Sequence, residues 1–227
     1  MKSSVITFPG SNCDRDMDVA LKKFGFKNKM VWHDDIELPK SDLVVLPGGF
    51  SYGDYLRCGS MASKSKIMKS VINFANSGGM VMGICNGFQI LVETGLVPGV
   101  LLRNKYLEFI CKNVFVKIND KKNTYFKNID SEVLEFHIAH NEGNYFCTND
   151  QLKEIEDNEQ VAINYCDKEG KTEEKFNPNG SIKNIAGIFN KEKNVLGMMP
   201  HPERMIDPSL SGEDGSLFFN NLINNLK

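Results

Sequence analysis

The chain has 227 residues, of which 41% are hydrophobic and 25% are charged, a composition typical of one globular domain with a substantial core. Its formal net charge is −2, so nothing in the composition indicates the concentrated basic face that binds nucleic acid. The sequence contains no apolar run of about 18 residues, so no membrane span is predicted. Its first residues have the pattern of a strand and a turn, and not that of a secretion signal. We therefore expect a single cytoplasmic domain over residues 1–227, with no nucleic-acid or membrane partner.

The first half of the chain alternates strand and helix patterns. β-rich runs that end at glycine or a polar turn predict strands, and apolar residues at helical spacing predict helices. Strands are expected within 4–10, 27–33, 41–50 and 80–84, and helices within 13–26, 62–79 and 86–97. The four consecutive apolar residues at 43–46 suit a strand that is covered on both faces. This order predicts an α/β fold with a single doubly wound, mostly parallel, flavodoxin-like sheet.

The second half has a different pattern, with β-rich runs and no good helical segment between them. Strands are expected within 112–118, 131–140, 160–166, 181–190 and 194–203, and a closing helix within 215–226. The Lys- and Asn-rich stretches 119–128 and 167–179 are interpreted as surface loops. These runs predict antiparallel additions to the sheet in the C-terminal half of the same domain.

One of the six cysteines stands in a special context. The chain has neither a CxxC pair nor a Cys/His spacing typical of metal sites, so no metal site is predicted. The stretch GICNG places Cys85 after an expected strand and before an expected helix, with Gly83 and Gly87 on either side. This is the layout of a nucleophile elbow with cysteine in place of serine, and the helix N-terminus favours the thiolate. The alternative is a core cysteine in an ordinary strand–helix turn, and the motif alone does not decide between them.

A thiol nucleophile needs a base, and His201 in the stretch GMMPHPER is the best candidate. Glu203 lies two residues further on. In an extended segment residues i and i+2 point to the same side, so Glu203 can hold one ring nitrogen of His201 while the other faces the thiol. The alternative is a surface His-Pro loop with a solvated glutamate, which would be preferred if Cys85 were absent.

The stretch VVLPGGF ends an expected strand in Pro-Gly-Gly, where backbone amides can face a site at the carboxyl ends of the strands. Together with the amide of Asn86, the residue after the nucleophile, the amide of Gly49 can form an oxyanion hole. A glycine-rich turn is common by itself, but the three motifs together are far less common than any one of them. In combination they favour a thiol enzyme that attacks a carbonyl group.

The motifs resemble those of the class I (triad) glutamine amidotransferases. L-P-G-G-F, G-x-C-N-G-x-Q and P-H-P-E carry the resemblance at the level of the class. GDYLRCG and MMPHPER, with PGSNCDRD, LLRNKYLEFICK and NPNGS, resemble more narrowly the glutaminase subunits of phosphoribosylformylglycinamidine synthase, an enzyme of purine biosynthesis. The matching stretches run from residue 9 to residue 204, so the resemblance implies one amidotransferase domain over residues 1–227.

The resemblance implies a catalytic triad of Cys85, His201 and Glu203 that releases ammonia from glutamine through a cysteine thioester. It implies glutamine-binding residues at Gly48, Gly49, Phe50, Asn86, Gln89, His140 and Asn141. The family usually has glycine at the second position of the stretch that reads HNEG here. Asparagine tolerates a left-handed backbone better than most residues, so we expect Asn141 to keep the geometry of the pocket and to narrow it.

The resemblance also implies partners. Ammonia is expected to pass to a separate ATP-using synthetase subunit, which converts formylglycinamide ribonucleotide to the amidine, and a small accessory subunit is expected in the complex. The chain has no G-x-x-x-x-G-K-[ST] motif, so no cofactor is expected in it, and ATP and Mg are expected in the synthetase. Low activity is expected without the partner, which would close the loop FSYGDYLRCG over the site.

Two other classes of function stay open on the residues alone. One is a cysteine peptidase or redox chaperone on the same α/β scaffold, for which Gln89 and the His-Pro-Glu stretch have no evident purpose. The other is a binding module with an inactive triad that regulates a synthetase, against which the intact Cys85, His201 and Glu203 count. Glutamine hydrolysis distinguishes all three.

Overall fold

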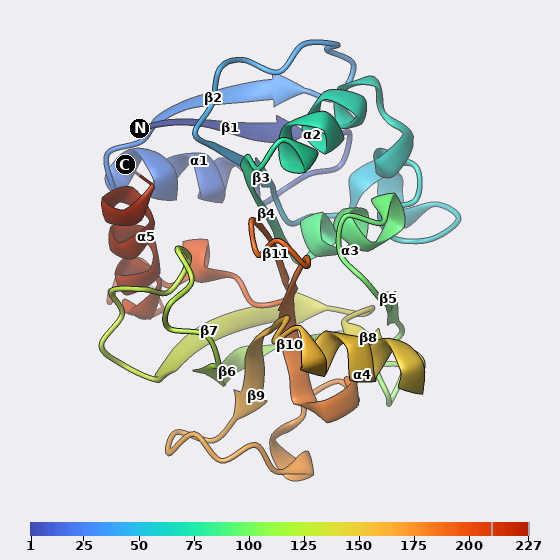
Figure 1. The fold of residues 1–227 in the computed structure, drawn as a ribbon, viewed down its shortest axis with the longest axis vertical. Helices are drawn as coiled ribbons and strands as arrows, with labels where there is room; N and C mark the ends of the chain where they lie inside the picture. Colours follow the sequence, from blue (N-terminus) through green and yellow to red (C-terminus); the bar gives the residue numbers. More distant parts are fainter. Residues whose placement is uncertain (210, 227) are drawn as a thin grey trace.

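The computed structural model describes residues 1–209 and 211–226, and a nine-stranded sheet runs through their centre (Figure 1). Its strands follow the order β2-β1-β3-β4-β11-β10-β9-β6-β7. They are Lys2–Thr7 (β1), Lys27–Trp32 (β2), Leu43–Leu46 (β3), Met80–Ile84 (β4), Ile110–Ile118 (β6), Val133–His140 (β7), Val161–Cys166 (β9), Ile185–Phe189 (β10) and Val195–Met198 (β11). Val100–Leu102 (β5) and Asn144–Phe146 (β8) form a separate two-stranded sheet.

The large sheet has a parallel half and an antiparallel half. β2, β1, β3, β4 and β11 are parallel neighbours, whereas β11, β10, β9, β6 and β7 are joined in antiparallel pairs. This confirms the doubly wound sheet with antiparallel additions from the C-terminal half. β11, which comes from near the end of the chain, lies directly beside β4, with Gly197 opposite Gly83 and Met198 opposite Ile84. The ends of these two strands therefore lie side by side.

Helices cover both faces of the sheet. They are Asp14–Lys23 (α1), Lys66–Asn76 (α2), Asn86–Thr94 (α3), Asn149–Asp157 (α4) and Asp214–Asn225 (α5). α1 and α5 lie together on one side, where the rings of Phe24 and Phe219 stack at 5.6 Å, and α2 and α3 lie on the other (Figure 1). None of the helices in the described residues is both long and apolar enough to cross a membrane.

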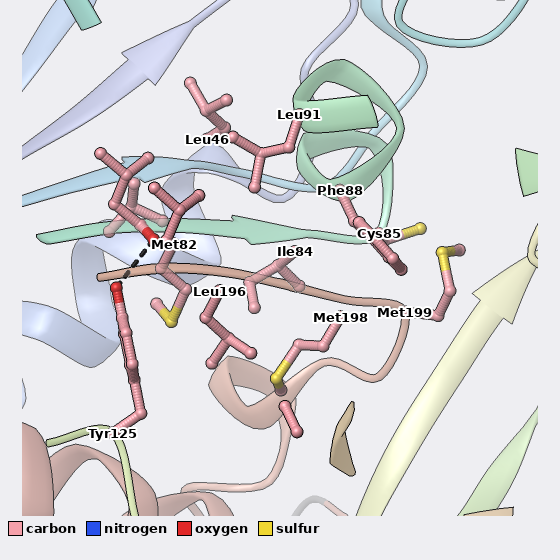
Figure 2. Close-up of a cluster of buried hydrophobic side chains, with 14 of the residues drawn as sticks. Leu46, Met82, Ile84, Cys85, Phe88, Leu91, Tyr125, Leu196, Met198 and Met199 are labelled. Atoms are coloured by element: carbon pink, nitrogen blue, oxygen red, sulfur yellow. Dashed lines mark hydrogen bonds between the residues drawn. The ribbon is translucent and has the colours of Figure 1, made fainter. Parts of the chain in front are cut away.

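The core lies between the central strands and these helices. Every residue of β3, β10 and β11 is buried, which confirms that an unbroken apolar run marks a strand covered on both faces. Figure 2 shows side chains from the middle of this core, with Cys85 at one end of the cluster and Tyr125 at the other. The nucleophile candidate therefore stands at the edge of a rigid, well-packed core.

The structure corrects two expectations about the second half of the chain. A helix, α4, does lie between the β-rich runs, and its N-terminus is closed by a capping box of Thr148 and Gln151. Its apolar pattern is weak because only Leu152 and Ile155 are buried. The stretch 119–128 is not only a surface loop, because Tyr125 and Phe126 within it are completely buried. The Tyr125 hydroxyl donates to the carbonyl oxygen of Val81 at 2.7 Å, which ties this stretch to β4 (Figure 2).

Candidate active site

Cys85 occupies a strained turn between β4 and α3. Its backbone has φ 51° and ψ −106°, a conformation that costs a non-glycine residue free energy and is typical of functional turns. The two flanking glycines are required sterically. A Cβ on Gly87 would collide with the carbonyl oxygen of Leu46, and one on Gly83 would lie 2.6 Å from the carbonyl oxygen of Gly87. The sequence thus folds into the elbow that the G-x-C-x-G spacing predicts.

His201 follows β11 and Glu203 follows two residues later, and both side chains are buried. His201 Nδ1 and Glu203 Oε1 are 2.6 Å apart. The segment between them is not extended, as the sequence suggested, because Pro202–Arg204 forms a short 3-10 turn that begins at the proline. The turn still brings the carboxylate onto the ring. Among the described residues, Nε2 of His201 has no hydrogen-bond partner, so it is available to the thiol or to a substrate.

Charge around His201 suits a general base. Burial by itself disfavours the imidazolium, but Glu203 and Cys85 outweigh it and raise the pKa of His201 well above its ordinary value. The backbone holds the ring's position, because the His201 amide donates to the carbonyl oxygen of His137 on β7 at 2.8 Å. On the other side, the Cys85 amide donates to the carbonyl oxygen of Met198 on β11 at 2.8 Å. Adjacent parallel strands therefore deliver the nucleophile and the base to one place.

The Gly48–Gly49 turn lies next to this pair. Gly49 has φ +136°, a conformation that side chains rarely adopt, and a Cβ there would lie 2.7 Å from the amide nitrogen of Asn12. The Phe50 amide is already bonded to the carbonyl oxygen of Gly10 at 3.0 Å, so Phe50 contributes to the site through its position and not through its amide. Asn86 is the first residue of α3, where an amide has no partner within the helix. Gly49 and Asn86 remain the oxyanion candidates.

The side chains of Asn86 and Gln89 are both engaged within the protein. Asn86 Nδ2 donates to Gln89 Oε1 at 2.8 Å, and Gln89 Nε2 donates to the carbonyl oxygen of Glu142 at 2.7 Å. Asn86 Oδ1 accepts from the Ser51 amide at 3.2 Å. This chain of hydrogen bonds links α3 to the end of β7 and to the glycine turn. Gln89 lines the pocket, but its carboxamide is used to hold the pocket wall in place.

His140 is a neutral residue of the pocket wall. Asn104 Nδ2 donates to the carbonyl oxygens of His140 and Glu108, both at 2.8 Å, so Asn104 Oδ1 faces the ring and accepts from His140 Nδ1 at 3.0 Å. Burial, reinforced by the nearby charge of His201, lowers the pKa of His140 to about 3. Asn141 has no positive φ, so the argument that asparagine tolerates a left-handed backbone does not apply here.

A pocket of about 230 Å³ opens in front of Cys85. It is lined by Gly49, Phe50, Asp54, Cys58, Cys85, Gln89, Arg103, Ala139, His140, Asn141 and Glu142. Of the residues expected from the sequence, Gly48, Asn86, His201 and Glu203 lie outside this lining. Gly48 packs behind it, since a Cβ there would lie 2.7 Å from Cε1 of His201.

Sequence reasoning missed the charged end of this pocket. Arg103 Nε lies 3.7 Å from Glu142 Oε1, and Asp54 stands nearby with a pKa raised by burial and by Glu142. Burial and these two carboxylates strongly raise the pKa of Cys58, so its thiol stays neutral and is a poor nucleophile. Asp54 lies in the stretch GDYLRCG and Arg103 lies in LLRNKYLEFICK. Both stretches carry the family resemblance, so a charged residue within them could have been recognised as a candidate for substrate binding.

One group of side chains has the composition of a metal site. Cys13, His201 and Glu203 are buried, and each places one ligand atom within 4.8 Å of the others. However, His201 Nδ1 and Glu203 Oε1 are already paired, and Cys13 Sγ accepts from Arg204 Nη2 at 3.1 Å. A cation at this position would meet the guanidinium charge. The arrangement is better suited to proton transfer than to metal binding.

Comparison with known proteins identifies the family of the chain. A family model for the CobB/CobQ-like glutamine amidotransferase domain matches residues 1–212. The phosphoribosylformylglycinamidine synthase subunit PurQ of Pelagibacter ubique (strain HTCC1062) is 82% identical over 227 residues, with 100% of both chains covered. The PurQ subunit of Synechocystis sp. is 50% identical over 217 residues, covering 95% of this chain and 97% of that one. The structure of PurLQS from Thermotoga maritima matches with a TM-score of 0.87 and 39% identity, covering 100% of this chain and 99% of that one.

The chain therefore belongs to the glutamine amidotransferases, because the family model covers most of its length. Identity of this extent over nearly the whole chain narrows the assignment. Within the class, the chain belongs to the PurQ family, the glutaminase subunits of phosphoribosylformylglycinamidine synthase in purine biosynthesis. The resemblance noted in the sequence is confirmed.

Proposed function

We propose that Cys85, His201 and Glu203 carry out the hydrolysis of glutamine in this subunit. His201 Nε2 takes the proton from Cys85 Sγ, and the sulfur attacks the carboxamide carbon of glutamine. The amides of Gly49 and Asn86 hold the oxyanion that forms. The C–N bond then breaks, the imidazolium gives its proton to the leaving nitrogen, and ammonia departs from a glutamyl thioester. His201 deprotonates a water that attacks the thioester, the C–S bond breaks as the imidazolium returns its proton to Cys85 Sγ, and glutamate leaves.

The observation that carries this proposal is the pairing of β4 with β11. It places the strained thiol and the Glu203-bound imidazole at the ends of two adjacent parallel strands, joined by the bond from the Cys85 amide to Met198. Within the described residues, Nε2 of His201 is buried and has no hydrogen-bond partner. A binding module with an inactive triad would have no need for such an unpaired buried atom. Free cysteines at all six positions suit a reducing compartment, and we expect the cytoplasm.

The charged end of the pocket supports recognition of the amino-acid end of glutamine. With the carboxamide at Cys85, the α-carboxylate would pair with Arg103 and the α-ammonium with Glu142 and Asp54. The substrate is a zwitterion, so a wall that carries both signs of charge matches it. Gly48, Gly49, Phe50, His140 and Asn141 shape the space between the two ends.

The rim of the pocket supports a partner on this face. Large exposed apolar side chains project from the loops on either side of it; they are Phe50, Tyr55, Leu56, Met61, Tyr106, Leu107 and Phe109. Leu56 and Leu107 are 78% and 69% exposed and hold φ values of 69° and 58°. Exposed apolar groups clustered at a site mouth are typical of an interface. We expect the ATP-using synthetase subunit, which would hold ATP and Mg, to dock here and receive ammonia, with a small accessory subunit in the same complex.

The first test is glutamate release from glutamine by the chain alone and with its synthetase subunit. We expect release that rises when the partner is added and that disappears in Cys85→Ala. Cys166→Ala, which removes another buried thiol on β9, serves as the matched control and should keep the activity. Equal release by Cys85→Ala and the native chain would refute the proposed nucleophile.

The second test separates docking from chemistry. Leu56→Asp and Leu107→Asp should weaken binding to the synthetase subunit about tenfold or more each, because they put a charge in an apolar contact. Val19→Asp, at a 59% exposed apolar position on α1, is the matched control and should bind normally. Calorimetry or a sedimentation titration measures the affinity. Unchanged affinity in both rim variants would place the partner on another face.

A further inference from the structure

Cys13 is a buried thiol beside the triad, outside the pocket lining that holds Cys58 and Cys85, and the proposed reaction gives it no role. It is 3% exposed and forms the N-cap of α1, so its position is fixed by the start of a helix. It belongs to the stretch PGSNCDRD, one of the motifs that carried the family resemblance. Neither the triad nor the glutamine pocket includes it.

Cys13 is held by Arg204, the residue that follows Glu203. Arg204 Nη2 donates to Cys13 Sγ at 3.1 Å, and Arg204 Nε donates to Asp16 Oδ2 at 3.3 Å. Burial opposes the charge on Arg204, but Cys13, Glu203 and Asp16 together raise its pKa, so the guanidinium stays charged. The N-terminus of α1 therefore binds, through Arg204, the segment that carries His201 and Glu203.

The same sulfur lies against the imidazole. Its distances to a ring nitrogen of His201 and to a carboxylate oxygen of Glu203 are within 4.8 Å. Gly48 fits between them, since a Cβ on Gly48 would lie 2.7 Å from Cε1 of His201 and 3.1 Å from Cys13 Sγ. The Cys13 amide in turn donates to the carbonyl oxygen of Gly48 at 3.3 Å. Cys13 thus touches the glycine turn, the base and the arginine at once.

We propose that Cys13 is a positioning residue of the glutaminase site, whose arginine-bound sulfur packs against the His201 imidazole and fixes the ring for proton exchange with Cys85. This inference rests on the proposed function. The guanidinium polarises the sulfur, and the sulfur presents its electron-rich side to the ring, which becomes positively charged when it takes the Cys85 proton. The Cys13 sulfur adds to the effect of Glu203 in raising the pKa of His201.

The His201 imidazole needs a positioning residue because few contacts fix its orientation. Among the described residues, one geometric hydrogen bond, from Nδ1 to Glu203, orients the imidazole, and Nε2 must stay free for chemistry. A single bond leaves the ring able to tilt about it. Gly48 on this side has no side chain, so the Cys13 sulfur supplies the packing contact that a larger residue at position 48 would otherwise give.

The test compares Cys13→Ala and Cys13→Ser in the complex with the synthetase subunit. In Cys13→Ala we expect kcat for glutamine hydrolysis to fall about tenfold, because a small misplacement of a catalytic group is costly, with little change in KM. Removing the sulfur also lowers the pKa of His201, so the acid limb of the pH profile of kcat/KM should move to lower pH. Cys13→Ser keeps a hydrogen-bond acceptor for Arg204 and should restore much of both properties.

Two further variants keep the inference falsifiable if Cys13→Ala folds poorly. Arg204→Lys cannot contact Asp16 and Cys13 in the same forked way, so it should shift the acid limb in the same direction. Cys147→Ala removes an equally buried thiol outside the site, 3% exposed, and should leave the profile unchanged. Thermal unfolding of every variant accounts for any loss of folded protein.

A pH profile in Cys13→Ala and Arg204→Lys that overlies that of the native complex would overturn the inference, even if overall activity fell. That outcome would leave Cys13 with a packing role alone. Failure of the proposed function is distinguishable, because the native complex itself would then release no glutamate from glutamine.

Discussion

Two walls of the proposed active site are built in different ways. The catalytic wall, formed by Cys85, His201 and Glu203, stands on the adjacent buried strands β4 and β11, and its side chains are at most 6% exposed. The recognition wall, formed by Asp54, Arg103 and Glu142, comes from loops, and the Arg103 side chain is 69% exposed. Proton transfer needs fixed distances, which the core supplies, whereas substrate entry and partner docking need surfaces that are accessible and adjustable.

The comparison has a consequence for mutational effects. Changes in the catalytic wall should act on kcat or on folding of the elbow, because its side chains are fixed in position and shielded from water. Changes in the recognition wall should act on KM and be smaller, because water screens the charges there.

Gly87→Ala should have the largest effect. A Cβ at this position collides with the carbonyl oxygen of Leu46 on β3, so the elbow cannot form without a shift of the backbone. We expect glutamine hydrolysis to be lost and stability to fall by roughly 1–3 kcal/mol. Gly95→Ala, at the other end of α3, has open space around its Cβ and is the control that tests backbone strain alone. Glutamate release and thermal unfolding measure both; a fully active Gly87→Ala would contradict the rigid elbow.

Glu203→Gln should come next. It keeps the shape of the side chain but removes the charge that raises the pKa of His201. We expect kcat to fall on the order of 10²–10⁴-fold, the range that general acid–base groups contribute. Because the pKa of His201 falls, the neutral imidazole persists to lower pH, and the acid limb of kcat/KM should move to lower pH. A variant with normal kcat would show that the 2.6 Å contact between His201 and Glu203 is not used.

Arg103→Ala tests the recognition wall. We expect KM for glutamine to rise about tenfold with kcat nearly unchanged, because the contact binds substrate and transition state alike. Arg103→Lys keeps the charge without the bidentate geometry and should give an intermediate KM. Steady-state glutaminase kinetics with the partner present measure both constants. A fall in kcat with an unchanged KM would mean that Arg103 acts on the chemistry and that the two walls are not separate.

The same division separates what the sequence predicts from what it does not. Cys85 was recognisable because the elbow is local: two glycines and a thiol within five residues, next to a strand. His201 and Glu203 are also close in the sequence, so their contact is predictable, although the backbone between them is a 3-10 turn and not the extended segment that the spacing suggests. The pairing of β11 with β4 joins residues more than a hundred positions apart, and no local pattern contains it. The sequence pattern alone assigns residues 194–203 to the antiparallel additions, whereas β11 is parallel to β4.

The misses have equally specific reasons. Asp54, Arg103 and Glu142 meet only after three separate segments have folded, so the charged end of the pocket has no sequence signature of its own. Tyr125 lies among lysines and asparagines, whose polarity hides one buried aromatic pair. The α4 helix buries only two residues, too few for a clear periodic pattern. Site residues that lie within a few positions of one another can be predicted from the sequence, whereas contacts between distant segments cannot.

The smallest effect concerns the two buried histidines, which should respond to pH in opposite directions. The pKa of His201 is raised on folding, so its contribution to stability is complete below its unfolded value of 6.5 and is lost as the pH rises through the folded pKa. The pKa of His140 is lowered from 6.5 to about 3, so its contribution is present above 6.5 and is lost as the pH falls from there.

We therefore expect the free energy of unfolding of the native chain to decline from pH 6.5 toward pH 5, by at most about 1.4 kcal/mol per pH unit from His140. His140→Gln removes the titrating ring and should flatten this decline, whatever its effect on stability at pH 7. Denaturant unfolding at several pH values measures it. Parallel slopes in the two proteins would show that His140 takes up a proton in the folded state. A positive charge on His140 would then lie near His201, lower its pKa and oppose its role as the base.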